Sequence, residues 1–113
     1  MIRRGDIVLV LFPNSDLITA KQRPALIVQA DNLQTNLNQV IIAMITSKMS
    51  RAGHSSRVTI LINSHEGQQS GLLTDSVIMT DNLATITLNA VYRIIGSISM
   101  ETVSNALRYT LAL

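Results

Sequence analysis

Two uninterrupted apolar runs constrain the fold of this chain more than any other feature of its sequence. Residues 7–12 (IVLVLF) and 40–45 (VIIAMI) each place six hydrophobic side chains in a row. A helix that spans a bilayer needs about 20 such residues, so neither run is long enough to cross a membrane. Short apolar runs rich in Val, Ile and Leu are typical of buried strands when polar or turn-forming residues bound them. We therefore expect a β-rich core and no membrane partner.

Several other segments also have the composition of strands. They are rich in β-branched residues or alternate between apolar and polar positions, and they lie at residues 24–29, 57–62, 75–80, 83–87 and 92–98. The segments that separate the strands are polar. We expect a turn at 13–16 that opens a loop to about Arg23, loops at 31–38 and 48–56, a long turn at 63–71 and a tight turn at 81–82.

The C-terminal segment has a different pattern, because its apolar side chains recur with a period of about 3.6 residues. Ser99 is a candidate N-cap and Glu101 lies in the first turn, so the pattern predicts an amphipathic helix over residues 99–113. Six or seven short strands closed by one helix indicate a single, mainly β domain over residues 1–113. The connections are too short for the crossover helices of a parallel sheet, which favours a small antiparallel barrel.

The composition narrows the class of protein. Only 14% of the residues are charged, against roughly 25% in an average soluble domain, while 47% are hydrophobic. Such a chain is not disordered, and we expect a homodimer to bury its surplus apolar surface, although a monomer covered by Ser, Thr, Asn and Gln is the alternative. No N-terminal segment has the pattern of a targeting signal, so we expect a cytoplasmic protein.

Familiar catalytic and metal-binding patterns are missing from the sequence. There is no cysteine, and the two histidines are isolated, so we expect no metal site and no cofactor. No nucleophile elbow, phosphate-cradling glycine loop or suitably spaced pair of carboxylates is present. The net charge is +2 and seven of the nine cations are arginines, which weakly favours a phosphate-bearing partner.

Arg23 is the first candidate functional residue. It stands immediately before Pro24, which restricts the backbone of Arg23 to the extended region and so fixes the direction of its side chain. A guanidinium held in this way can clamp a phosphate. The alternative is a structural ion pair with Asp6 or Asp16.

Thr46 and Ser47 are the second candidates, because they end the apolar run at the point where the chain leaves the core. A hydroxyl there can donate to a phosphate oxygen or orient a neighbouring group. The alternative is an ordinary hydroxyl at a strand end that bonds only to the backbone.

Together these stretches resemble the MazF/PemK family of toxins from type II toxin–antitoxin systems. The resemblance extends over almost the whole chain, and its short motifs keep the order and spacing of the family. They are RGDIV (4–8), FP (12–13), RPALIV (23–28), IAMITS (42–47), DSVI (75–78), DNLATI (81–86) and IGSI (95–98).

The resemblance implies an SH3-like barrel with a C-terminal helix, which is usually a homodimer. It implies a metal-independent endoribonuclease, or mRNA interferase, that cleaves single-stranded RNA at a short sequence through attack of the ribose 2′-hydroxyl. The family's catalytic arginine and threonine fall on Arg23 and Thr46, and Ser47 adjoins that threonine. A cognate antitoxin is the implied protein partner. Since arginine stays protonated, His54 is one candidate for the proton acceptor.

Four further cations lie in polar segments near these residues, and they are Lys21, Lys48, Arg51 and Arg57. They would contact flanking phosphates of the RNA, or they would simply form a solvated loop face. Two other functions stay open. Toxins with a related barrel inhibit DNA gyrase through protein–protein contact, and a non-cleaving relative would bind RNA without cutting it.

Overall fold

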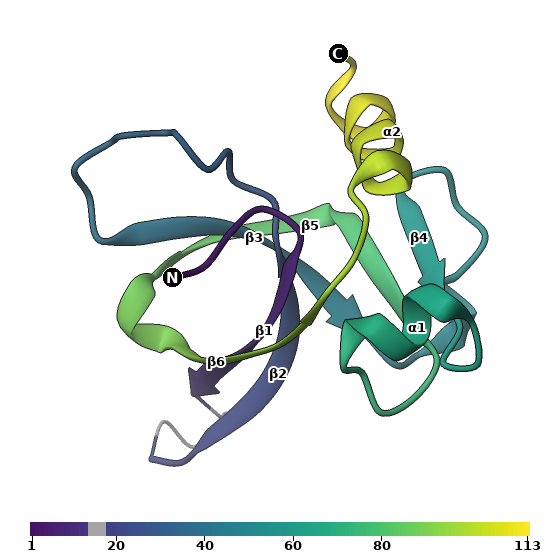
Figure 1. Cartoon of the computed structure of the whole chain (residues 1–113), viewed down its shortest axis with the longest axis horizontal. Helices are drawn as coiled ribbons and strands as arrows, with labels where there is room; N and C mark the ends of the chain where they lie inside the picture. Colours follow the sequence, from purple (N-terminus) through teal and green to yellow (C-terminus); the bar gives the residue numbers. More distant parts are fainter. Residues whose placement is uncertain (14–17) are drawn as a thin grey trace.

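A computed structural model describes residues 1–13 and 18–113 of the chain, and these residues form a mainly β fold with a C-terminal helix, as expected (Figure 1). The strands are β1 (Asp6–Pro13), β2 (Ala20–Ile27), β3 (Gln39–Thr46), β4 (Arg57–Ile60), β5 (Ser76–Thr87) and β6 (Val91–Ser97). The helices are α1 (His65–Ser70) and α2 (Glu101–Leu111), and the short 3₁₀ turns are η1 (Met49–Arg51) and η2 (Leu88–Ala90). None of the described helices is both long enough and apolar enough to span a bilayer.

The six strands form one antiparallel sheet in the order β4-β5-β3-β2-β1-β6. The sheet curls strongly, and η2 joins the end of β5 to β6, which lies at the edge of the sheet beside β1 (Figure 1). Helix α2 lies outside the curled sheet, close to β4 and β5. The prediction of a small antiparallel barrel closed by one helix is confirmed.

Most of β1 and β3 is buried on both faces, which explains the uninterrupted apolar runs of these two strands. Alternate side chains of a strand point to opposite faces, so Val8 and Ile42 lie in a core inside the curl while their neighbours Ile7 and Ala43 lie in a second core outside it. The second core is completed by β4, α2 and the segments around them. Its buried members from these elements include Val58, Ile60, Val103 and Ala106.

The predicted tight turn at 81–82 is wrong, because β5 runs through both residues. β3 pairs Met44 with Met79 and then Ala43 with Leu83, so residues 80–82 of β5 have no partner on β3. Such an irregularity bends a strand, and here it leaves Asp81 and Asn82 exposed while Thr80 stays buried. The polar residues Asp81 and Asn82 therefore mark a bend within β5 and not a turn between two strands. Because of this bend, one long strand packs against both cores.

Other boundaries also differ from the predictions. Residues 63–71 contain the short helix α1 rather than only a turn, because the Ser64 hydroxyl accepts from the Gly67 N–H at 2.9 Å and caps it. Strand β2 begins at Ala20, not at Pro24, and α2 begins at Glu101 with Met100 as its N-cap. Residues 14–16 of the turn predicted at 13–16 lie outside the described residues.

Candidate active site

A cleft of about 850 Å³ opens between the β1–β2 end of the sheet and the segment that follows α1. Its walls come from β2, from the end of β3 and the η1 turn, from residues 71–74 and from β6. These elements are distant in sequence, and the curl of the sheet brings them together around one cleft.

Arg23 lies in the solvent-exposed first half of β2, opposite Val10 of β1, and lines this cleft. Its guanidinium makes no hydrogen bond or ion pair with any residue in the described ranges, 1–13 and 18–113. The Asp6 carboxylate instead accepts from the backbone N–H of Arg3 at 2.8 Å, so the alternative of an Arg23–Asp6 pair is wrong. Asp16 lies outside the described residues. Arg23 is thus a cation with its donors open to the cleft.

Thr46 is the last residue of β3, opposite Val77 of β5, and it is partly buried in the wall of the same cleft. Its hydroxyl oxygen accepts a hydrogen bond from the backbone N–H of Lys48 at 3.2 Å. An oxygen that accepts in this way keeps its own proton for a ligand. Ser47 follows Thr46 on the cleft wall. The structure therefore brings the guanidinium and both hydroxyls, which the sequence separates by more than 20 residues, into one cleft.

The cleft concentrates positive charge. Five of the nine Lys and Arg residues of the chain line it, and no acidic residue in the described part of the chain does. The cations are Lys21, Arg23, Lys48, Arg51 and Arg93. A concave site lined by one sign of charge focuses the field and attracts a polyanion. A chain with a net charge of only +2 thus carries a strongly cationic site, which composition could not reveal.

Arg93 is the cleft residue that the sequence reasoning missed. It lies on β6, opposite Leu9 of β1, and it is exposed. The signal available in the sequence was that Arg93 is the only charged residue of the predicted strand 92–98. Strand pairing decides whether such a charged side chain faces bulk solvent or a binding site, and the pairing of this strand could not be predicted from the sequence.

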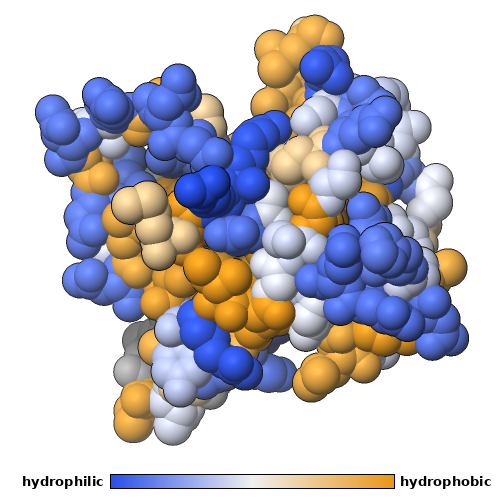
Figure 2. All heavy atoms as spheres, in the orientation of Figure 1, coloured by the Kyte–Doolittle hydropathy of each residue, from blue (hydrophilic) through white to orange (hydrophobic). Residues whose placement is uncertain are grey.

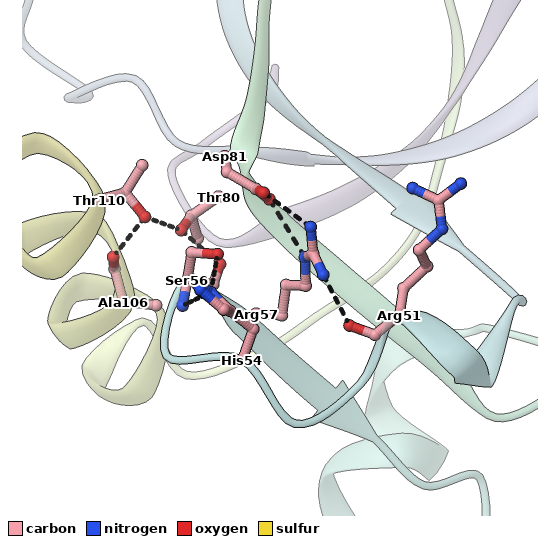
Figure 3. A network of polar contacts seen from close by, with 8 residues as sticks. All are labelled: Arg51, His54, Ser56, Arg57, Thr80, Asp81, Ala106 and Thr110. Carbon is pink, nitrogen blue, oxygen red and sulfur yellow. Dashed lines mark hydrogen bonds and ion pairs between the residues drawn. The ribbon is translucent and has the colours of Figure 1, made fainter.

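Two of the sequence candidates lie elsewhere. Arg57 is not part of the cleft wall, because its guanidinium forms an ion pair with Asp81 at 2.8 Å (Figure 3). The His54 ring accepts from the Ser56 backbone N–H at 3.1 Å and lies edge-on to the Tyr109 ring of α2. It also stays outside the cleft wall, so the idea that His54 acts as proton acceptor in this site finds no geometric basis.

The uncharged lining of the cleft is mostly aliphatic, with the polar side chains of Gln22, Thr74, Ser76 and Asn82 among it. It includes Leu9, Met44, Leu72, Met79 and Ile95, and Leu73 stands at the rim with 97% of its surface exposed. Within residues 1–13 and 18–113, no aromatic side chain lines the cleft. A nucleobase in this site would therefore pack on aliphatic and methionine side chains instead of stacking on an aromatic ring.

Carboxylates and imidazoles do not gather anywhere in the described ranges, so no group of three or more of them could hold a metal ion there. The chemistry that this cleft offers from its own side chains is that of guanidinium, ammonium and hydroxyl groups. These groups bind and polarise phosphate oxygens.

Comparison with known proteins identifies the class. The profile of the PemK-like, MazF-like toxins of type II toxin–antitoxin systems matches residues 3–111. The chain therefore belongs to this toxin family, and the resemblance that its motifs suggested is confirmed. A comparison by sequence with curated proteins gave no significant match.

Three solved structures illustrate the similarity of fold. An endoribonuclease in complex with its cognate antitoxin, from a mycobacterial species, has a TM-score of 0.76 at 17% identity, covering 100% of this chain and 97% of that one. The Mycobacterium tuberculosis toxin MazF-mt6 has a TM-score of 0.73 at 24% identity, covering 96% and 97%. The MazE–MazF structure from Deinococcus radiodurans has a TM-score of 0.73 at 16% identity, covering 99% and 97%. These likenesses establish the fold.

Proposed function

We propose that this toxin is a metal-independent endoribonuclease that cleaves single-stranded RNA, chiefly mRNA, at a short sequence. The observation that carries the proposal is that Arg23 and Thr46 line one cleft, with their donors unpaired, among four further cations and no described carboxylate. Such a cleft matches a phosphodiester better than it matches a neutral or cationic substrate. The structural neighbours described as endoribonucleases support the same activity.

RNA carries its own nucleophile in the ribose 2′-hydroxyl. In the proposed reaction the 2′-oxygen forms a bond to phosphorus while the bond from phosphorus to the 5′-oxygen breaks. This leaves a 2′,3′-cyclic phosphate, and the departing 5′-oxygen takes a proton from solvent to become a 5′-hydroxyl. Arg23 binds the non-bridging oxygens and stabilises the charge that develops on them. Thr46 donates its free hydroxyl proton to one of these oxygens. Placement and electrostatic stabilisation supply most of the rate enhancement in such a reaction.

The proton of the 2′-hydroxyl has no obvious acceptor in the cleft. Arg23 stays protonated, and no described carboxylate or imidazole lines the wall. In this proposal the proton therefore leaves to solvent, and the enzyme relies on in-line positioning more than on general base catalysis. Because no enzyme group then titrates as a general base, the rate should rise with hydroxide concentration, by close to tenfold per pH unit between about pH 6 and 8, without a plateau or a bell-shaped profile.

Lys21, Lys48, Arg51 and Ser47 bind the nucleotides that flank the scissile linkage. The four lie along the same wall as the catalytic pair and make no side-chain hydrogen bond or ion pair to other residues of the described ranges. Phosphate contacts of this kind hold the strand in register but carry little sequence information. The cut sequence is then read at the base edges by uncharged groups of the cleft, among which the amides of Gln22 and Asn82 can donate and accept hydrogen bonds.

An antitoxin and a second copy of the chain are the proposed protein partners, and the cytoplasm is the proposed compartment. Structural neighbours are described as complexes with an antitoxin. An acidic, amphipathic segment would complement a cationic cleft with an aliphatic floor. Figure 2 shows apolar side chains at the surface in several places, including the C-terminal end of α2, where Tyr109 and Leu111 are about half exposed or more. A homodimer interface would cover surface of this kind.

The test is to incubate the purified protein with a long transcript in the presence of EDTA, and to map the 5′ ends and the terminal phosphates of the fragments. We expect cuts at a recurrent short sequence with 2′,3′-cyclic phosphate ends. RNA retention without cutting would instead support the non-cleaving relative. Neither cutting nor binding, together with inhibition of DNA supercoiling by gyrase, would support the gyrase-directed toxin.

A further inference from the structure

The loop at residues 48–56 carries two of the cleft cations, Lys48 and Arg51, and it is fastened at three points. Its start is held by the hydrogen bond from the Lys48 N–H to Thr46. Its end is held because the Thr80 hydroxyl and backbone N–H both donate to the Ser56 carbonyl, at 2.5 and 3.0 Å. Its middle is held by Arg57, as Figure 3 shows.

All three arms of the Arg57 guanidinium are occupied. Nε and Nη2 donate to the two carboxylate oxygens of Asp81, at 3.4 and 2.8 Å, and Nη1 donates to the backbone carbonyl of Arg51 at 3.2 Å. The Arg57 side chain is only 23% exposed and that of Asp81 35%. Asp81 occupies the outward bend of β5, where residues 80–82 have no partner on β3. The bend therefore presents the carboxylate that orients Arg57.

The side chain of Arg51 extends away from the Arg57–Asp81 pair in Figure 3, and it lines the cleft. Its carbonyl is the group that Arg57 holds. We propose that Arg57 and Asp81 form a positioning pair: they do not touch RNA, but they fix the η1 turn so that Arg51 meets a flanking phosphate. The inference rests on the proposed function only in naming RNA as the polyanion that Arg51 meets.

Arginine is required at position 57 for a geometric reason. Only a planar fork with several donors can bond a carboxylate with two nitrogens and a carbonyl with the third. Lysine would keep the charge and the ion pair but could not make all three bonds. Without Asp81, the guanidinium would lose the partner that fixes its plane, and the hold on Arg51 would loosen.

The test measures binding of a mixed-sequence single-stranded DNA oligonucleotide, which lacks the 2′-hydroxyl and is not cut, over a series of salt concentrations. Arg51→Gln should reduce the slope of log K against log salt by about 0.7, the value for one phosphate contact on a single strand. Arg57→Gln should reduce it by a similar amount. The double variant should lose no more than either single variant, because both changes remove the same contact.

Asp81→Asn should change the affinity for the oligonucleotide in opposite directions, depending on whether Arg57 positions Arg51 or contacts nucleic acid itself. If Arg57 positions Arg51, the neutral amide should weaken oligonucleotide binding about threefold to fivefold, which is roughly 0.6–1 kcal/mol. Tighter binding by Asp81→Asn would mean that the carboxylate had restrained a cation that contacts nucleic acid itself, and it would overturn the inference. A double variant Arg51→Gln/Arg57→Gln that loses about twice the salt slope would overturn it as well.

Two charge-matched control variants and a second measurement, the KM and kcat of RNA cleavage, separate the positioning role from a general loss of structure. Glu101→Gln on α2 makes the same charge change as Asp81→Asn, and Arg108→Gln matches Arg57→Gln; neither residue lines the cleft. In RNA cleavage, Arg57→Gln should raise KM about fivefold and leave kcat within about twofold, whereas a general loss of structure would lower kcat. Arg57→Lys should fold and give an intermediate KM. If the wild type binds the oligonucleotide but does not cut RNA, the proposed activity fails while the binding data still decide the positioning role.

Discussion

The backbone N–H of Lys48 donates a hydrogen bond to the side-chain oxygen of Thr46 over 3.2 Å. This bond links the proposed catalytic hydroxyl directly to the loop that carries the flanking cations. It occupies a lone pair of the hydroxyl oxygen and leaves the hydroxyl proton for the ligand in the cleft. In the proposed mechanism one side chain thus fastens the loop and also donates to the scissile phosphate.

Removal of the Thr46 hydroxyl should be costly even when the shape of the side chain is kept. We expect Thr46→Val to lower kcat by about 100-fold, the usual loss for one donor to a developing charge. Thr46→Ser keeps the hydroxyl and should retain activity within about tenfold of the wild type. Single-turnover cleavage of a defined oligoribonucleotide measures both variants. Equal activity of the Val and Ser variants would remove the hydroxyl from the mechanism.

Arg23 should be harder to replace than any other cation of the cleft. Arg23→Ala removes the group that neutralises the scissile phosphate, and we expect at least a ~100-fold loss of kcat. Arg23→Lys restores the charge without the planar fork and should recover only part of the loss. Arg108→Ala on α2 is the control and should stay near wild-type activity. Circular dichroism confirms that each variant folds, and a folded Arg23→Ala protein with normal turnover would contradict the assignment.

Arg93 should contribute to binding more than to the chemical step. It lines the cleft from β6, without a hydrogen bond or ion pair to another described side chain. We expect Arg93→Gln to reduce the salt slope of oligonucleotide binding by about 0.7 and to leave kcat at saturating RNA almost unchanged. Fluorescence anisotropy over a salt series measures the slope. An unchanged slope would mean that the Arg93 side chain faces solvent during binding.

Gly71 should tolerate no side chain, whereas Gly53 should tolerate one at moderate cost. Both have positive φ, but a Cβ on Gly71 would come within 1.9 Å of the Ile95 carbonyl oxygen, while a Cβ on Gly53 would meet nothing within 4 Å. We expect Gly53→Ala to cost about 1–2 kcal/mol through its left-handed backbone alone. Gly71→Ala adds a backbone clash, so its melting temperature should fall further, by ~10 °C or more. Differential scanning calorimetry compares the two, and equal shifts would contradict the close packing of α1 on β6.

The Arg57–Asp81 pair should leave a signature in acid. The pKa of Asp81 lies below its ordinary value of 3.8, and the main cause is the hydrogen bonding of its carboxylate to Arg57. A carboxylate whose pKa is lower in the folded state adds stability above its unfolded pKa and loses it as the pH falls through the folded pKa. The stability difference between wild type and Asp81→Asn should therefore be constant near pH 6 and shrink below about pH 3.8. Urea denaturation at several pH values measures it, and a difference independent of pH would contradict the pair.

The strands could be predicted where local pattern and global burial agree. Residues 7–12 and 40–45 lie in strands, as predicted, and their apolar runs follow from burial of both faces over most of their length, with Leu11 an exposed exception. Prediction failed where a polar segment that looks like a turn in the sequence is explained by the packing of the folded chain. The polar pair Asp81 and Asn82 was taken for a turn, yet it is a bend within β5. Helix α1 was missed because a helix of six mostly polar residues has no apolar period to reveal it.

The candidate site divides in the same way. The sequence by itself was enough to choose Arg23 and Thr46 as candidate site residues and to suggest the family of the chain. It also indicated the extended backbone that Pro24 imposes on Arg23. Only the tertiary structure decided that Arg93 joins the cleft, that Arg57 turns to Asp81 and that His54 stays outside the cleft wall. The physical reason is that a side chain's partners depend on strand register and on the curl of the sheet. Both are set by burial summed over the whole chain and not by the residues beside it.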